Sequence, residues 1–278
     1  MLSWMDLISY VTEPFQYGFM LRALGVAIII SIICPLVGVF VITRGYGFMG
    51  DAMAHSIFPG MALALIAGLS PWFGMLPAAL VFAFLIGFLI RKTGIEADAA
   101  IGILFASLFA LGIVMISIWG ANVNVNLEDI LLGQILAVTE SDILVTLGVT
   151  ILTLVIFAGY FKELMFVSFD PVGAEVAGIR VAWIDYLLLA LISVVVVVTI
   201  QAVGVILVLA MLIAPAAAAT LAANRIFHII GYGILFALIA SISGLYASYY
   251  GNLPSGASIA LASGIIFAVV ATIRRRIS

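Results

Sequence analysis

Long apolar runs with few charges fill almost the whole of this chain. They lie at 18–42, 52–69, 72–90, 99–119, 143–161, 183–200, 203–222, 227–249 and 256–273. A run of about 20 apolar residues can cross the hydrocarbon core of a bilayer as an α-helix. The sequence therefore predicts an all-α fold, a polytopic integral membrane protein with eight or nine transmembrane helices. The stretch 183–222 decides the count, because it forms either two spans hinged at 201–204 or one span and a broken helix.

Composition supports the same class of protein. Charged residues make up 8% of the 278 residues and hydrophobic residues 66%, whereas a soluble domain carries about 25% charged residues. We therefore expect one transmembrane domain over 1–278, set in the lipid bilayer, with no separate soluble domain and no nucleic-acid partner. Cys34 is the only cysteine and lies in an apolar run, so we expect it to be a buried packing residue.

The basic residues between the runs fall in alternate loops. They are Arg44, Arg91, Lys92, Lys162, Arg180, Arg225, Arg274, Arg275 and Arg276. Because cytoplasmic loops carry an excess of Lys and Arg, nine spans place the C-terminus in the cytoplasm and the N-terminus outside. If two runs merge or the first segment holds an extra helix, the N-terminus lies inside instead. The loops on the other side carry acidic residues and no Lys or Arg. The same bias explains them, and a weak mouth that attracts cations is the alternative.

The stretch 44–60, R-G-Y-G-F-M-G-D-A-M-A-H-S-I-F-P-G, is the most unusual part of the chain. Asp51 and His55 are four residues apart, a spacing that puts both side chains on one face of a helix. A carboxylate and an imidazole together make half of a divalent-metal site, while a simple hydrogen bond between them is the structural alternative. Gly45 allows a tight bend before the helix, and Pro59-Gly60 predicts a kink or a close helix approach after it.

This stretch also resembles the signature of a known family. The pattern R-G-x-x-x-M-G-D-A-x-x-H-x-x-x-P-G is similar to that of the membrane permease subunit of bacterial ABC importers for manganese, zinc and iron, most like the manganese branch. The resemblance implies that Asp51 and His55 contact the transported Mn²⁺ (or Zn²⁺ or Fe²⁺), and that no cofactor is bound permanently. It also implies a homodimer in the cell membrane, two copies of a separate ATP-binding cassette ATPase subunit, and an extracellular metal-binding protein.

A second segment, F-D-P-V-G-A-E-V-A-G-I at 169–179, predicts a short helix on the cytoplasmic side. Asp170 suits the N-cap, Pro171 the first helical position and Gly178 the end. The segment is either a surface connector or, as its resemblance to the family pattern F-D-x-x-x-A-x-x-x-G-I implies, a helix that couples the permease to the ATPase. The residues assigned to this coupling are Phe169, Asp170, Pro171, Ala174, Gly178 and Ile179.

Several kinds of chemistry find no support in the sequence. There is no G-x-x-x-x-G-K-[ST] phosphate-binding loop, no H-E-x-x-H and no Cys/His cluster, so we expect this chain not to be an enzyme and ATP hydrolysis to take place on a separate subunit. A stand-alone secondary metal-ion transporter is the alternative function. It would need coupling ions and internal repeats, and no repeat is apparent.

Overall fold

The computed structural model describes residues 13–119 and 135–277, and these residues are helical almost throughout. Two short 3-10 helices, η1 (Glu13–Gln16) and η2 (Ile135–Ala137), accompany the α-helices. The α-helices are α2 (Gly18–Thr43), α3 (Met49–Ser56), α4 (Phe58–Ile66), α5 (Trp72–Thr93), α6 (Ala97–Trp119), α8 (Glu140–Phe169), α9 (Pro171–Val176), α10 (Val181–Val203), α11 (Val205–Ala222), α12 (Ile226–Gly251) and α13 (Ser255–Ile277). Within the described residues, nine segments are long and apolar enough to cross a membrane, α3 and α4 counting as one. The predicted all-α polytopic membrane protein is confirmed.

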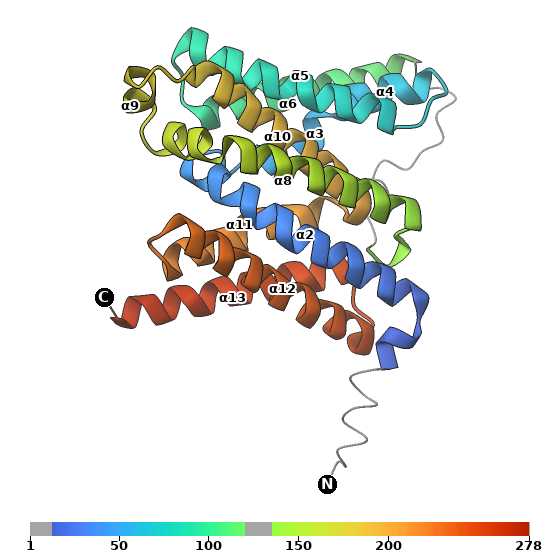
Figure 1. The fold of residues 1–278 in the computed structure, drawn as a ribbon. Helices are drawn as coiled ribbons and strands as arrows, with labels where there is room; N and C mark the ends of the chain where they lie inside the picture. Colours follow the sequence, from blue (N-terminus) through green and yellow to red (C-terminus); the bar gives the residue numbers. More distant parts are fainter. Residues whose placement is uncertain (1–12, 120–134, 278) are drawn as a thin grey trace.

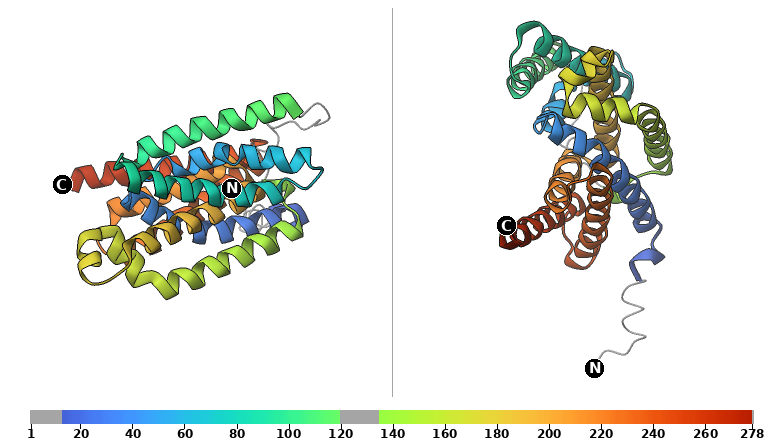
Figure 2. Two further views of the ribbon diagram at one scale, coloured as in Figure 1. Left: turned by 90° about the horizontal axis from the view of Figure 1, so that it is seen from above. Right: turned by 60° about the vertical axis from the view of Figure 1, so that its left-hand side comes forward.

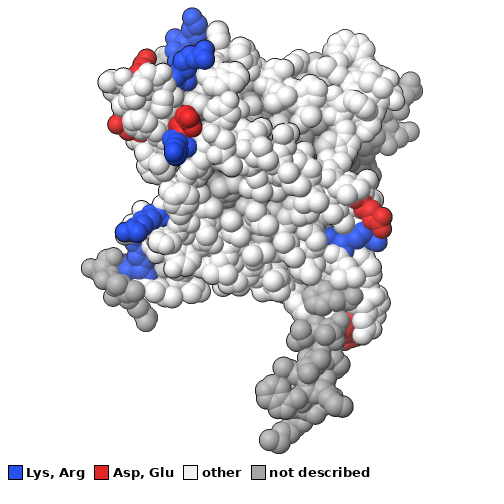
Figure 3. All heavy atoms as spheres, viewed as in Figure 1, with Lys and Arg blue, Asp and Glu red and all other residues white. Residues whose placement is uncertain are grey.

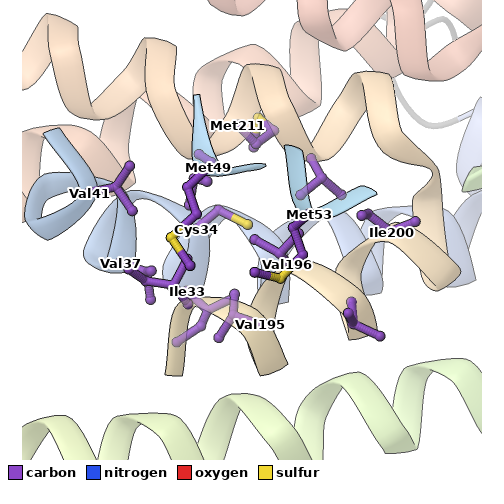
Figure 4. Packing of buried hydrophobic residues seen from close by; sticks show 14 of the residues in the cluster. Ile33, Cys34, Val37, Val41, Met49, Met53, Val195, Val196, Ile200 and Met211 are labelled. Carbon is purple, nitrogen blue, oxygen red and sulfur yellow. The ribbon is translucent and has the colours of Figure 1, made fainter. Parts of the chain in front are cut away.

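The long helices lie side by side with their axes roughly parallel (Figures 1 and 2). α2 and α10 are the most buried spans. α2 packs against α8, α11 and α12, while α10 packs against α5 and α8. Their apolar side chains fill the core that Figure 4 shows from close by, and Cys34 is fully buried there, as predicted.

One end of the bundle carries most of the charge. There α2, α5, α8 and α11 end, α10 and α12 begin, and α9 and the C-terminus lie (Figure 1). Lys and Arg gather at this end, which we call the basic end, and a smaller charged group lies at the opposite end (Figure 3). At the opposite end Arg22 donates from Nε to the carbonyl of Val138 at 3.1 Å. The alternation of basic loops predicted from the sequence is therefore a real segregation of charge in space.

The second span is broken into two short helices. α3 ends at Ser56 and α4 begins at Phe58, so Pro59 lies in the first turn of α4, where its missing N–H leaves no gap in the hydrogen bonding. Gly60 faces Gly74 of α5, and a methyl group on either glycine would overlap the carbonyl of the other. Both parts of the prediction for Pro59-Gly60, a break in the helix and a close approach, are confirmed.

Two boundaries are sharper than the sequence indicated. Gly204, with φ of 89°, separates α10 from α11, which decides in favour of two spans between 181 and 222. α8, in contrast, continues to Phe169 past an irregular turn at Tyr160. Lys162 therefore lies in a helix rather than in a loop, because Leu164 and Val167 beyond it are buried and extend the apolar packing.

Part of the chain cannot be compared with expectation. Residues 1–12, 120–134 and 278 lie outside the described residues. The acidic residues that the sequence analysis expects in the outer loops within 1–12 and 120–134 belong to them. Farther along, Thr139 and Asp142 form a capping box at the start of α8, so these polar residues begin a span.

Candidate functional site

Asp51 and His55 lie one turn apart on α3, as the sequence predicted. His55 Nε2 is 3.9 Å from Asp51 Oδ1, and the side chains are 27% and 35% exposed, respectively. That distance is too long for a direct hydrogen bond. The two side chains are therefore both partly exposed and do not saturate each other, so a carboxylate oxygen and an imidazole nitrogen both remain available to a cation.

The opposite face of α3 is apolar and anchors the helix. Met49 and Met53 point into the core, where they lie close to α2, α10 and α11 (Figure 4). Met49 and Asp51 are two residues apart, as are Met53 and His55, and residues at that spacing lie on nearly opposite sides of a helix. Packing the methionine side against the core therefore turns the side with Asp51 and His55 outward. The amphipathic pattern of this short helix thus fixes the direction of both candidate ligands.

The imidazole of His55 is enclosed on one side by aromatic rings. Its ring centroid lies 5.6 Å from that of Phe105 and 5.2 Å from that of Phe109, both on α6, in edge-to-face arrangements. Nδ1 is buried and has no hydrogen-bond partner within 13–119 and 135–277. Nε2 is therefore the nitrogen directed toward Asp51. The sequence analysis missed these two phenylalanines, although their i, i+4 spacing on one span was a visible signal.

The pair is incomplete as a metal site within one chain. Across the described ranges, no group of three or more His, Cys, Asp or Glu side chains is close enough to hold an ion. A stable divalent-metal site uses four or more ligands. Asp51 and His55 are therefore suited to transient contact with an ion, or to a site completed by another chain.

The predicted short helix at 170–179 is present as α9. The Asp170 carboxylate accepts a hydrogen bond from the Gly173 amide at 2.8 Å, and Pro171 begins the helix. Gly178 takes the left-handed conformation, with φ of 85°, and the Ile179 amide donates to the Ala174 carbonyl at 3.0 Å.

The side chains of this segment separate into two sets. Ala174 is fully buried and Ile179 packs against the core, whereas Phe169, Val172 and Val176 are strongly exposed. The predicted helix ends are thus confirmed. The segment presents an apolar surface at the basic end; whether that surface couples to an ATPase stays a prediction.

A group of ion-paired side chains, which we call the ion cluster, lies close to both segments. The sequence analysis did not identify it. Asp185 of α10 pairs with Arg44 and, at 3.5 Å, with Arg91 of α5. Arg44 also donates to the carbonyl of Val167, near the end of α8, at 3.1 Å. The cluster therefore joins the loop that precedes α3 to both helices that flank α9. Arg44 belongs to the unusual stretch, but its partner lies 141 residues away and gave no local signal.

Comparison with known proteins assigns this arrangement of helices to a family. The sequence model of the ABC 3 transport family matches residues 16–274, which include α3, α9 and the ion cluster. The chain belongs to this family. As a member of the ABC 3 transport family it is a multi-pass membrane protein, and the resemblance found in the sequence is confirmed.

Individual relatives cover nearly the full length of this ABC 3 chain. The manganese transport system membrane protein MntC of Halalkalibacterium halodurans is 39% identical over 264 residues, 95% of this chain and 90% of the relative. The manganese import system permease protein ScaB of Streptococcus gordonii is 40% identical over 261 residues, 94% and 93% of the two chains. The solved structure of PsaBC from Streptococcus pneumoniae in complex with a Fab is 37% identical, with a TM-score of 0.80 and 95% coverage of both chains.

Proposed function

We propose that this chain is the membrane permease subunit of an ATP-driven importer and that Mn²⁺ is the ion it carries. The observation that carries the proposal is the open face of α3, where Asp51 and His55 present an oxygen and a nitrogen ligand 3.9 Å apart. Such a mixed set suits Mn²⁺, Fe²⁺ and Zn²⁺. The relatives named above are a manganese transport system membrane protein and a manganese import system permease protein, which favours Mn²⁺ among the three.

A homodimer would complete the ion pathway. One Asp and one His are too few for a divalent ion, and a two-fold axis beside α3 would bring two of each together. A mixed oxygen and nitrogen site of four ligands, without thiolates, binds such an ion without trapping it. A conducting site must release what it binds.

The energy would come from partner subunits. The sequence holds no phosphate-binding loop, so we infer that two copies of an ATP-binding cassette ATPase subunit bind at the basic end. Val172 and Val176 project from α9 one turn apart and are exposed. They would form the contact, with Asp170, Pro171 and Gly178 fixing the shape of the helix. An extracellular metal-binding protein would deliver the ion at the opposite end.

The same proposal fixes the placement of the chain in the cell. We infer that residues 1–278 form one transmembrane permease domain in the cell membrane, with the basic end and the C-terminus in the cytoplasm. The Lys and Arg at the basic end support this orientation (Figure 3). Labelling of single cysteines, introduced at exposed Ser70 and at exposed Thr272 in a Cys34→Ala background, tests it. A membrane-impermeant reagent should reach only the first from outside intact cells.

Transport by the reconstituted complex is the decisive experiment. Proteoliposomes that hold this chain with its ATPase should take up radiolabelled Mn²⁺ only when the metal-binding protein and ATP are supplied, and the chain alone should show no ATPase activity. Uptake by the chain alone, driven by an ion gradient, would favour the secondary transporter and overturn the proposal. Competition by Zn²⁺ and Fe²⁺ in the same assay ranks the three ions.

The role of α9 has its own test. Replacement of residues 172–176 by a Gly/Ser linker should prevent co-purification with the ATPase and abolish ATP-driven uptake, while the amount of folded protein in the membrane stays the same. A linker of equal length over 67–71, between α4 and α5 at the opposite end, is the control and should leave co-purification unchanged. Normal ATPase binding by the 172–176 variant would remove the coupling assignment.

A further inference from the structure

The imidazole of His55 contacts aromatic rings and makes no hydrogen bond to any described residue. Nδ1 is buried without a partner, and Nε2 lies 3.9 Å from the nearest carboxylate oxygen. A histidine that binds a metal ordinarily donates its second N–H to a carboxylate, a carbonyl or a water, and that bond fixes the orientation of the ring. The described residues give His55 no such bond, so its orientation must come from other contacts.

Phe105 and Phe109 provide that support. They lie one turn apart on α6, and their rings are nearly parallel, with centroids 6.1 Å apart and an interplanar angle of 7°. The imidazole meets them at interplanar angles of 63° and 67°. Edge-to-face contacts of this kind are favourable and directional. Two such contacts on one side of the ring restrict its rotation.

The two phenylalanines are themselves held in place by rings that flank α3. Phe48, just before α3, meets Phe105 edge-on at 6.0 Å and 89°. Phe58, at the start of α4, meets Phe109 at 5.5 Å and 68°. The rings of Phe48, His55 and Phe58, which lie before, within and after α3, therefore all contact the same two phenylalanines of α6. α6 is in contact with α3 and α4 although little of its own surface is buried.

We infer that Phe105 and Phe109 are positioning residues, which hold His55 so that Nε2 stays directed toward Asp51 and the passing ion. The inference rests on the proposed function. It adds that α6, which contributes no ligand, sets the affinity of the pathway for the ion. Removal of the rings should leave the imidazole in place but free to rotate, so metal binding weakens while the helices stay assembled.

The double substitution F105L/F109L tests this role, with F84L/F88L as the matched control. Phe84 and Phe88 are also one turn apart and stacked, at 6.3 Å and 21°, but on α5, where Phe84 meets Tyr186. Binding of Mn²⁺ to the detergent-purified complex with its ATPase, followed by the paramagnetic resonance signal of free Mn²⁺, should weaken about tenfold in F105L/F109L, as for loss of an outer-shell partner. The control should bind as the unmodified protein does. The single variants F105L and F109L should each weaken binding less than the double variant.

Thermal stability and uptake separate the possible outcomes. If the rings serve only packing, F105L/F109L will lose stability while its Mn²⁺ affinity per folded complex is unchanged, and the inference fails. It also fails if F84L/F88L weakens binding equally. If the double variant does not fold, unchanged affinity in both single variants overturns the inference. Asp51→Asn in parallel tests the proposed function: normal uptake in that variant refutes the site itself, whereas lost uptake there with unchanged affinity in F105L/F109L refutes only the role of the rings.

Discussion

Two small groups of ionisable side chains lie on α3 or close to it, and they differ in how many partners each side chain has. In the ion cluster, Asp185 has two arginine partners, and Arg44 makes a further hydrogen bond to Val167. Arg44 and Asp185 are only 14% and 17% exposed. In the other group, Asp51 and His55 are more exposed, lie 3.9 Å apart and leave Nδ1 without a partner.

The difference separates two uses of a carboxylate in a membrane protein. Removing a charge from water is costly, and partners must offset that cost. Asp185 has its partners within the protein, so its charge holds helices together and has little left for an ion. Among the described residues Asp51 has only the long contact with His55, at 3.9 Å, so its charge remains available. Counting the partners of each carboxylate thus separates the structural role of Asp185 from the ligand role proposed for Asp51.

The largest expected effect is that of Asp51→Asn. The amide has nearly the same shape but is neutral and a weaker ligand, so we expect Mn²⁺ uptake per folded complex to fall by at least about 100-fold, with little change in the amount of folded protein. His55→Ala should behave alike. The double variant should lose little more than either single one, because ligands of one site act together. Radiolabelled Mn²⁺ uptake in proteoliposomes is the measurement. Near-normal uptake would show that Asp51 is not a ligand of the transported ion.

Asp185→Asn should show the reverse pattern. Two arginines would face a neutral amide, and the loss of charged hydrogen bonds should lower stability by about 2 kcal/mol. We expect a lower midpoint of thermal unfolding in detergent, followed by tryptophan fluorescence. Uptake per folded complex should remain well above that of Asp51→Asn. Unchanged thermal stability together with lost uptake would show that Asp185 belongs to the ion pathway.

Arg91→Gln should lower thermal stability less than Asp185→Asn does. The variant tests whether burial decides how much each arginine partner of Asp185 contributes to stability. Arg91 is 43% exposed and 3.5 Å from Asp185, a geometry that contributes at most about 1 kcal/mol. Thermal unfolding should shift less than in Asp185→Asn. High salt should reduce the difference from the unmodified protein, because solvent-exposed ion pairs are screened. A shift as large as that of Asp185→Asn would mean that the cluster works as one unit.

The smallest effect is expected at the other histidine. His228 is exposed on α12 near the basic end and lies outside the Asp51–His55 pair. His228→Ala should change stability by no more than about 0.5 kcal/mol and leave Mn²⁺ uptake unaltered. It therefore serves as the control for His55→Ala in the same uptake assay. A clear loss of uptake would extend the pathway to α12.

The sequence predicted local features well and distant partners poorly. Hydropathy predicted eight or nine spans and left 183–222 undecided, until Gly204 was seen to separate α10 from α11. The ends of α9 follow from Asp170, Pro171 and Gly178, whose preferences act within a few residues. The continuation of α8 was missed because Lys162 ends an apolar run without ending the helix. The partner of Arg44 and the rings around His55 depend on which helices pack together. A single sequence does not contain that information in any local pattern.

The low hydropathy of the broken span has a consequence for the synthesis of the protein. The span formed by α3 and α4, Met49–Ile66, has a mean hydropathy of 1.2, while every other candidate span lies between 2.0 and 2.9. A segment this polar partitions weakly from the translocon into lipid on its own, so it needs its neighbours α2 and α5 at the moment of membrane integration. Glycosylation mapping of the span alone, compared with a longer segment that includes both neighbours, would measure that dependence. The segment that carries both candidate ligands is thus the one whose entry into the bilayer is least autonomous.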